Sequence, residues 1–294
     1  MREACTQSGF FYLAGHGVSQ ELQDRVFMLN RVLFALPLEV KRGLLADENN
    51  RGWTPFREET LDPQTQREGD TKEGFYFGRE VPRDHPEAAL PLHGPNQWPD
   101  EVSFPSLSGY RATMEEYLAA CIGVGHRLLH VLALSLGLEA AYFEPYFTQP
   151  MVFLRPLHYE PVVSVPQDGL LGAGAHSDYG MITLLLTDHV PGLQIHTEAG
   201  VWLDVPPSPG AFIVNLGDML ERWTNGKYKS TMHRVVNVTG QERYSIPCFF
   251  EPNFTAQVEC LTCCCGPDSP PKFASTTAGQ HILAKYAQTH SGYK

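Results

Sequence analysis

The chain has 294 residues, 43% of them hydrophobic and 19% charged, with 22 Lys and Arg against 33 Asp and Glu and a net charge of −11. This composition is typical of a globular domain rather than a disordered chain, and the length is enough for a well-buried core. The acidic balance would repel a nucleic-acid backbone, and no run reaches the roughly 18 apolar residues that cross a bilayer, so neither partner is expected.

Residues 1–100 predict an N-terminal helix and loop region packed on a core. The run Gly-Phe-Phe-Tyr-Leu at 9–13 is typical of a strand. A helix is predicted over 19–36, with Ser19 as its N-cap. Apolar residues recur on one face of that helix at helical spacing, namely Leu22, Val26, Leu29 and Leu33.

Residues 101–294 predict a β core with two supporting helices. A long helix is expected over 106–136, interrupted near Gly123 and Gly125, and a last helix over 277–289. Between them lie short β-type runs separated by Pro and Gly, at 151–159, 181–186, 193–196, 211–215 and 243–250. Many short strands at such intervals indicate an antiparallel sandwich or barrel, here forming one structural unit with the N-terminal region.

The motif His176-Ser177-Asp178 is the sharpest chemical signal. In a strand, residues two apart project to the same side, so His176 and Asp178 can reach one point. His233 is the natural third ligand, because two His and one carboxylate form the facial triad of non-haem Fe(II) oxygenases. Neither His189 nor His196 has a carboxylate two residues away on the same predicted strand face, so both are interpreted as structural.

A second pair, Arg243 and Ser245, follows ten residues after His233. Arg offers a planar fork for a carboxylate, and Ser adds one hydroxyl donor. Together they suit the distal carboxylate of 2-oxoglutarate. The alternative interpretation is a surface Arg that lies near a Ser by chance. That interpretation would be preferred if no metal motif lay upstream.

Four segments resemble the Fe(II)/2-oxoglutarate-dependent dioxygenase family related to isopenicillin N synthase. They are GFFYLAGHGV, HSDYGMITLLLTDHVPGLQIH, VNLGDMLERWTNGKYKSTMHRVV and RYSIPCFFEPN, in the family's order. The resemblance implies a mainly β fold with flanking helices, built on a distorted double-stranded β-helix, or jelly roll. It also implies Fe(II) as the cofactor and 2-oxoglutarate and dioxygen as co-substrates, with ascorbate as a reductant.

The resemblance assigns residues as well. It implies iron ligation by His176, Asp178 and His233, and co-substrate anchoring by Arg243, Ser245 and Tyr159. The chain departs from the family at Leu157, where some relatives have Asn, and at Glu160, where Pro is usual. The strand that normally precedes GFF is also missing, so an edge strand is expected to be absent.

Alternation along the strands extends the prediction to a substrate pocket. If Arg243 and Ser245 face the interior, Phe249 and Glu251 do too, and an inward Tyr159 places Arg155 inside. We expect Arg155 or Glu251 to bind a polar group of a compact substrate. The alternative is that they pair with each other or with loop residues.

Other clusters favour no separate site. Zinc at Cys260-x-x-Cys263-Cys264-Cys265 would need a second Cys/His pair that does not follow. His126 and His130 lie one helical turn apart without a visible third ligand. The segment Asp70-Lys72-Glu73 before Phe75-Tyr76-Phe77 resembles the border of a substrate entrance, or simply a charged turn. Seven cysteines without a disulfide-like distribution favour a reducing cytoplasm.

The predicted function is a 2-oxoglutarate-dependent dioxygenase of the EC 1.14.11 type. It would oxidise a small molecule, most simply by hydroxylation, and release succinate and CO2 as a cytoplasmic monomer. Two alternatives stay open: an iron oxidase of the same family that does not use 2-oxoglutarate, and a binding protein without catalysis.

Overall fold

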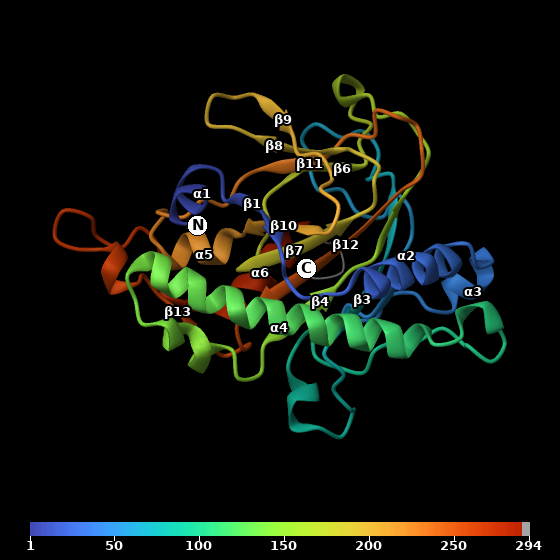
Figure 1. The fold of residues 1–294 in the computed structure, drawn as a ribbon, viewed down its shortest axis with the longest axis horizontal. Helices are drawn as coiled ribbons and strands as arrows, with labels where there is room; N and C mark the ends of the chain where they lie inside the picture. Colours follow the sequence, from blue (N-terminus) through green and yellow to red (C-terminus); the bar gives the residue numbers. More distant parts are fainter. Residues whose placement is uncertain (290–294) are drawn as a thin grey trace.

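The computed structural model describes residues 1–289, which form two antiparallel sheets flanked by helices (Figure 1). The larger sheet has eight strands, in which β5 (Leu157–Tyr159) pairs with both β12 and β3. The other seven are, in spatial order, β1 (Phe10–Ala14), β10 (Ala211–Leu216), β7 (Ile182–Thr187), β12 (Arg243–Glu251), β4 (Met151–Leu154), β3 (Lys72–Gly78) and β2 (Gly52–Thr54).

The smaller sheet has four strands and lies above the larger sheet in Figure 1. Its order is β6 (Ala173–His176), β11 (His233–Val235), β8 (Leu193–His196) and β9 (Trp202–Asp204). The pair β13 (Gln257–Val258) and β14 (Thr276–Thr277) forms a separate ribbon. Two antiparallel sheets of this kind, with flanking helices, confirm the predicted jelly-roll class.

The N-terminal region does more than pack on the core. Strands β1, β2 and β3 all belong to the larger sheet, and β1 forms its edge beside β10. The predicted division at residue 100 therefore cuts through one sheet. Helix α2 (Gln20–Phe34) begins after Ser19, whose side chain accepts a hydrogen bond from the N–H of Leu22 at 3.2 Å, as the sequence predicts.

The remaining helices surround this sandwich. They are α1 (Arg2–Gln7), α3 (Leu38–Arg42), α4 (Tyr110–Leu136), α5 (Asp218–Trp223) and α6 (Ala278–Thr289), with short 3-10 turns at Pro86–Ala89, Pro105–Leu107, Ala140–Tyr146, Pro166–Asp168 and Thr262–Cys264. Segment Pro105–Leu136 is long and apolar enough to cross a membrane by length and composition, but 44% of its most apolar window is buried in the fold. The core helix of a globular protein has the same properties.

Helix α4 is continuous where the sequence predicts an interruption. Gly123 and Gly125 both lie within Tyr110–Leu136. At Gly125, a Cβ atom would lie 2.7 to 2.8 Å from ring atoms of Phe250, whereas at Gly123 its nearest neighbour would be Arg127 at 3.7 Å. Gly125 therefore allows the helix to approach β12 closely, and the helix tolerates the glycine for that contact.

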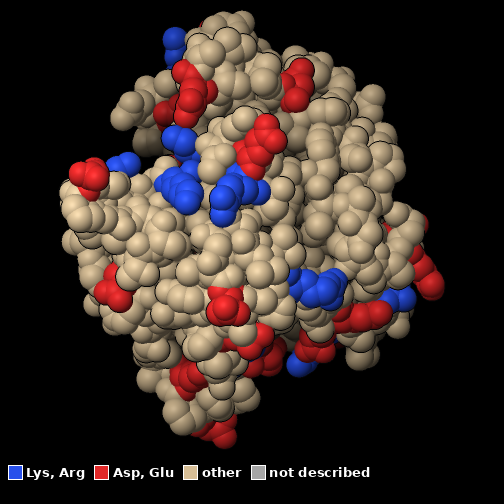
Figure 2. Space-filling model, turned by 60° about the vertical axis from the view of Figure 1, so that its left-hand side comes forward, with Lys and Arg blue, Asp and Glu red and all other residues tan. Residues whose placement is uncertain are grey.

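Charge is distributed unevenly over the surface. On the face that Figure 2 displays, several Lys and Arg side chains lie together in one small cluster, and others are scattered among the Asp and Glu side chains. No broad basic surface covers this face, in keeping with the net charge of −11.

Replacing Gly125 with Ala tests the close approach. We expect G125A to lower the free energy of unfolding by about 1–3 kcal/mol, because the new methyl group overpacks against Phe250. G123A is the matched control and should be neutral or stabilising by up to about 1 kcal/mol, since Ala favours helix and meets open space there. Urea unfolding of both variants measures the difference, and equal effects would contradict the packing argument.

Candidate metal centre and adjoining cavities

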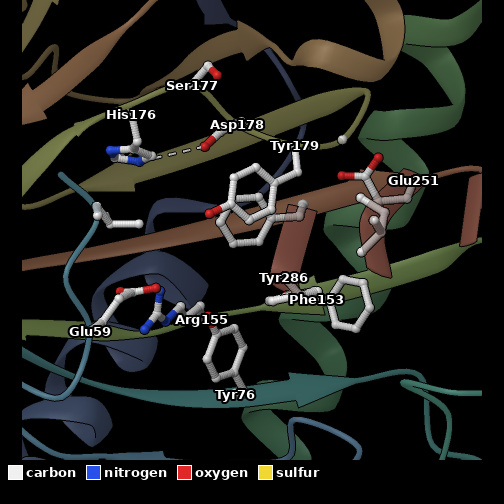
Figure 3. Close-up of a pocket in the computed structure, with 14 residues that line it drawn as sticks. Glu59, Tyr76, Phe153, Arg155, His176, Ser177, Asp178, Tyr179, Glu251 and Tyr286 are labelled. Atoms are coloured by element: carbon white, nitrogen blue, oxygen red, sulfur yellow. Dashed lines mark hydrogen bonds and ion pairs between the residues drawn. The ribbon is translucent and has the colours of Figure 1, made fainter. Parts of the chain in front are cut away.

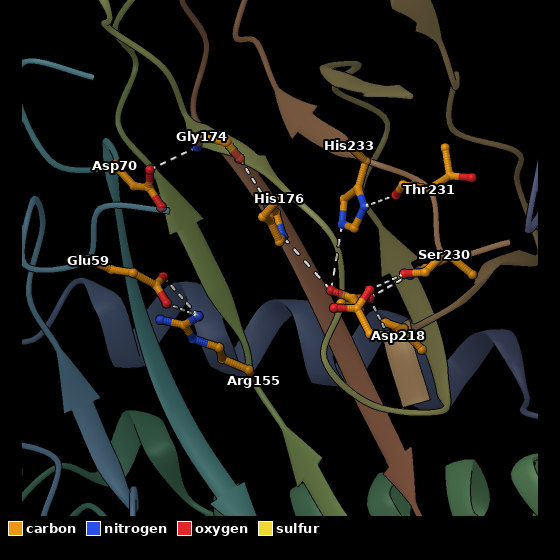
Figure 4. A network of polar contacts seen from close by, with 12 residues as sticks. Glu59, Asp70, Arg155, Gly174, His176, Asp218, Ser230, Thr231 and His233 are labelled. Atoms are coloured by element: carbon orange, nitrogen blue, oxygen red, sulfur yellow. Dashed lines mark hydrogen bonds and ion pairs between the residues drawn. The ribbon is translucent and has the colours of Figure 1, made fainter. Parts of the chain in front are cut away.

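The predicted metal ligands meet in the smaller sheet (Figure 4). His176 ends β6 and His233 begins β11, and the two residues are direct partners in the antiparallel register. Asp178 follows two residues after His176. The ligand atoms of all three lie within 4.8 Å of one another, with Asp178 Oδ1 at 3.9 Å from His176 Nε2 and 3.7 Å from His233 Nε2.

Both imidazoles are oriented by the backbone. Nδ1 of His176 lies 2.8 Å from the carbonyl oxygen of Gly174, and Nδ1 of His233 lies 3.1 Å from that of Thr231. A proton on each Nδ1 satisfies these carbonyls and leaves the Nε2 lone pair for a metal. Burial, together with the charge of His233, lowers the pKa of His176 to about 4, so its imidazole is neutral at pH 7.

Asp178 is held through its second oxygen. Thr183 on β7 and Asn215 on β10 both donate to Oδ2 at 2.5 Å, and these two residues are cross-strand partners. Burial alone would raise the pKa of Asp178, but the neighbouring imidazoles and these hydrogen bonds lower it. The carboxylate is therefore ionised, with Oδ1 directed to the histidines. This His-Asp-His donor set fits Fe(II).

A cavity extends from the three ligands between the two sheets. Arg243 and Ser245 on β12 and Tyr159 on β5 line it, and each is at most 3% exposed. Arg243 and Tyr159 are register partners, and the guanidinium carbon lies 4.8 Å from the Tyr159 ring centre. Leu157 also lines this wall as an apolar side chain.

The Arg243 guanidinium has buried donors without acceptors. Its Nε and one terminal nitrogen form no hydrogen bond with the residues that the structure describes. A buried donor without an acceptor is costly, and a carboxylate oxygen can supply a missing acceptor. The cavity therefore fits an anionic ligand such as the distal carboxylate of 2-oxoglutarate.

A second cavity adjoins the metal centre (Figure 3). Arg155, Phe249 and Glu251 all line it, and Arg155 and Phe249 also line the first cavity, so the predicted strand alternation places these side chains as expected. Burial raises the pKa of Glu251 to about 8. Arg155 pairs with Glu59, at 3.0 Å, and not with Glu251.

Several residues of these cavities were not assigned from the sequence. Thr183 and Asn215 are polar residues within apolar strands, a signal that could have indicated a buried partner. Tyr286 and Ile282 come from α6, and nothing in their local sequence points to a cavity. Further unassigned lining residues include Glu59, Leu61, Lys72, Tyr76 and Tyr179, of which Lys72 and Tyr76 lie in the segment interpreted as an entrance border.

The other clusters stay apart from this centre. Among residues 1–289, His176, Asp178 and His233 are the group of His, Cys, Asp and Glu side chains close enough to share a metal ion. His130 pairs with Glu144 at 2.8 Å on the surface of α4. All seven cysteines are free thiols, with the Sγ atoms of Cys263 and Cys264 3.7 Å apart.

Comparison with known families defines the class. Residues 148–252 match the 2OG-Fe(II) oxygenase superfamily, and residues 1–101 match the N-terminal family described as non-haem dioxygenase in morphine synthesis. The chain belongs to the 2OG-Fe(II) oxygenase superfamily. It is an Fe(II)- and 2-oxoglutarate-dependent dioxygenase that oxidises a small molecule, as the sequence predicts.

Individual relatives are similar over most of their length. The 2-oxoglutarate-Fe(II) type oxidoreductase hxnY of Emericella nidulans is 42% identical over 297 residues, covering 99% of this chain and 84% of that protein. Kihadalactone A synthase LFS of Citrus sinensis is 36% identical, covering 98% and 86%. A full-length protein of Neurospora crassa, crystallised in complex with alpha-KG, is 31% identical, with a TM-score of 0.85 over 98% of this chain and 88% of that one.

The Thr183 hydrogen bond to Asp178 can be tested by T183V, which keeps the shape but removes the hydroxyl. We expect Fe(II) affinity to fall by about 10–100-fold, because outer hydrogen bonds orient a ligating carboxylate. Anaerobic Fe(II) titration measures it. T187V, on the same strand, makes the same exchange away from Asp178 and should bind Fe(II) like the wild type. An unchanged affinity in T183V would contradict the supporting role.

Proposed function

We propose that His176, Asp178 and His233 hold the Fe(II) of this dioxygenase and that Arg243, Ser245 and Tyr159 hold the distal end of 2-oxoglutarate. The observation that carries the proposal is the buried Arg243 fork with unpartnered donors, at the end of a cavity that begins at the three ligands. The substrate then occupies the second cavity, lined by Arg155, Phe249 and Glu251.

Each group has a defined task in this arrangement. The bound iron supplies the activation of dioxygen, one atom of which enters the substrate and the other succinate, as CO2 is released. The protein contributes two imidazole nitrogens, an ionised carboxylate and the buried guanidinium of Arg243. The sandwich excludes bulk water from the site, which strengthens the Arg243–carboxylate interaction.

Succinate release distinguishes this function from its alternatives. We expect the wild-type protein, supplied with Fe(II), 2-oxoglutarate, ascorbate and air, to form succinate, and H176A to lose at least about 99% of this activity because one ligand is gone. H196A is the control, because His196 lines a separate surface groove and should leave succinate release unchanged. Full activity in H176A would contradict the metal assignment. Iron uptake without succinate would favour the oxidase that does not use 2-oxoglutarate.

Arg243 has a separate test. We expect R243L to raise the Kd for 2-oxoglutarate by about 100-fold or more, because a buried charge pair is lost, while Fe(II) binding in the absence of 2-oxoglutarate is retained. R243K should be intermediate, since Lys keeps the charge without the fork. Anaerobic titration of the Fe(II)–2-oxoglutarate absorption band measures these constants, and equal affinities for R243L and wild type would overturn the assignment.

A further inference from the structure

The walls of the second cavity are mainly flat aromatic rings. Phe153, Phe249, Tyr76, Tyr179 and Tyr286 line it, together with Ile282 and the 176–180 segment (Figure 3). Tyr179 and Tyr286 meet edge to face, with ring centres 5.9 Å apart. Walls of this kind favour a planar ring over a flexible chain, because stacked and edge-to-face contacts need a flat partner.

The cations beside this cavity are already neutralised. A guanidinium nitrogen of Arg155 lies 3.0 Å from a carboxylate oxygen of Glu59; the Arg155 side chain is buried and that of Glu59 is partly buried. Lys72 forms ion pairs with the same Glu59 and with Asp70. These two cations face two carboxylates, so the cluster has no net charge.

Arg155 still has one unused donor. Its Nε has no acceptor among the described residues. A neutral carbonyl oxygen could satisfy that N–H. A carboxylate there would add a second anion beside Glu59, without a cation of its own to offset the loss of hydration. The cavity therefore disfavours an anionic substrate.

Glu251 is the polar group on the opposite side of the cavity from Glu59 in Figure 3. It is 2% exposed and accepts one hydrogen bond, from the N–H of Met181 to Oε2. Its other oxygen, Oε1, lies against Gly180, where a Cβ atom would come within 1.6 Å. A side chain at Gly180 is therefore incompatible with this position of the Glu251 carboxyl group.

We propose that the substrate is an uncharged, planar cyclic amide whose N–H and C=O edge is bound by Glu251 between the aromatic walls. This inference rests on the proposed function, since it assigns the substrate of the same site. A buried carboxyl group that holds its proton can donate to a carbonyl and accept from an N–H, which matches a cyclic amide edge. Arg155 is a wall residue and does not capture a substrate carboxylate.

Three ligands with the same ring test whether the cavity rejects a negative charge and whether it binds the N–H and C=O edge of the amide. Thymine presents the neutral amide edge, 1,3-dimethylthymine blocks it, and uracil-5-carboxylate replaces the methyl group with a negative charge. Each is titrated anaerobically into protein that holds Fe(II) and 2-oxoglutarate, with the metal absorption band as readout, and 2-pyridone serves as a second neutral cyclic amide. We expect at least one neutral cyclic amide to bind and to accelerate succinate release.

The expected contrast is about tenfold or more in Kd between thymine and either altered ligand, the size of one lost hydrogen bond or one unpaired charge. Carboxylate binding as tight as that of the neutral ring would overturn the proposal, as would binding by neither thymine nor 2-pyridone. Loss of the absorption band before any ring is added is a different result. It would contradict the proposed function itself.

Variants of Glu251 separate substrate binding from support of the metal loop. We expect E251L to raise the Kd of the neutral ring by about tenfold, and E251Q, which keeps a donor and an acceptor, to stay within about threefold of wild type. Both should retain the wild-type Kd for 2-oxoglutarate. E242Q, at an exposed carboxyl just before the same strand, is the control and should match wild type throughout. A weaker 2-oxoglutarate complex in E251L with unchanged ring binding would show that Glu251 only positions the 178–181 segment.

Discussion

The pairing of His176 with His233 across β6 and β11 is the constraint on which the site depends. Antiparallel register places the two residues directly opposite, and the two-residue step along the chain adds Asp178 to the same point. A shift of one residue in this pairing would move one imidazole to the other face of the sheet. The metal centre is therefore a consequence of strand register, and the rest of the fold serves to hold that register.

The two sheets contribute different residues to the site. The smaller sheet carries both histidines, while the larger sheet carries Arg243 and Ser245 and supports Asp178 through Thr183 and Asn215. A cationic anchor and a metal centre repel each other if they are close, and the separation of the sheets gives each its own wall. The cavity between them is lined by the three candidate ligands and by Arg243 and Ser245.

The second cavity differs from the first in the balance of its buried charges. Glu59 and Asp70, both from the N-terminal region, together neutralise Arg155 and Lys72, so the positive charge of this part of the interior is balanced within the protein. Arg243, in contrast, forms no ion pair with a residue that the structure describes, and two of its nitrogens have no acceptor there. The two buried arginines thus differ in their partners, and this difference separates a site for an anionic co-substrate from a cavity with neutralised walls.

The sequence by itself determined the fold class, singled out the three residues whose ligand atoms the structure brings within 4.8 Å of one another, and predicted which residues of β12 line the cavities. Those features depend on local alternation and on short motifs, which strand geometry converts directly into positions. Only the tertiary structure decided the partner of Arg155, the support of Asp178 and the contribution of Tyr286 from α6. These features depend on contacts between segments that can be far apart in the sequence. Arg155 and Glu59, for example, are about 100 residues apart. Local patterns carry no information on such contacts. The continuity of α4 through Gly125 is a further example, because it depends on the ring of Phe250 that packs against the helix there.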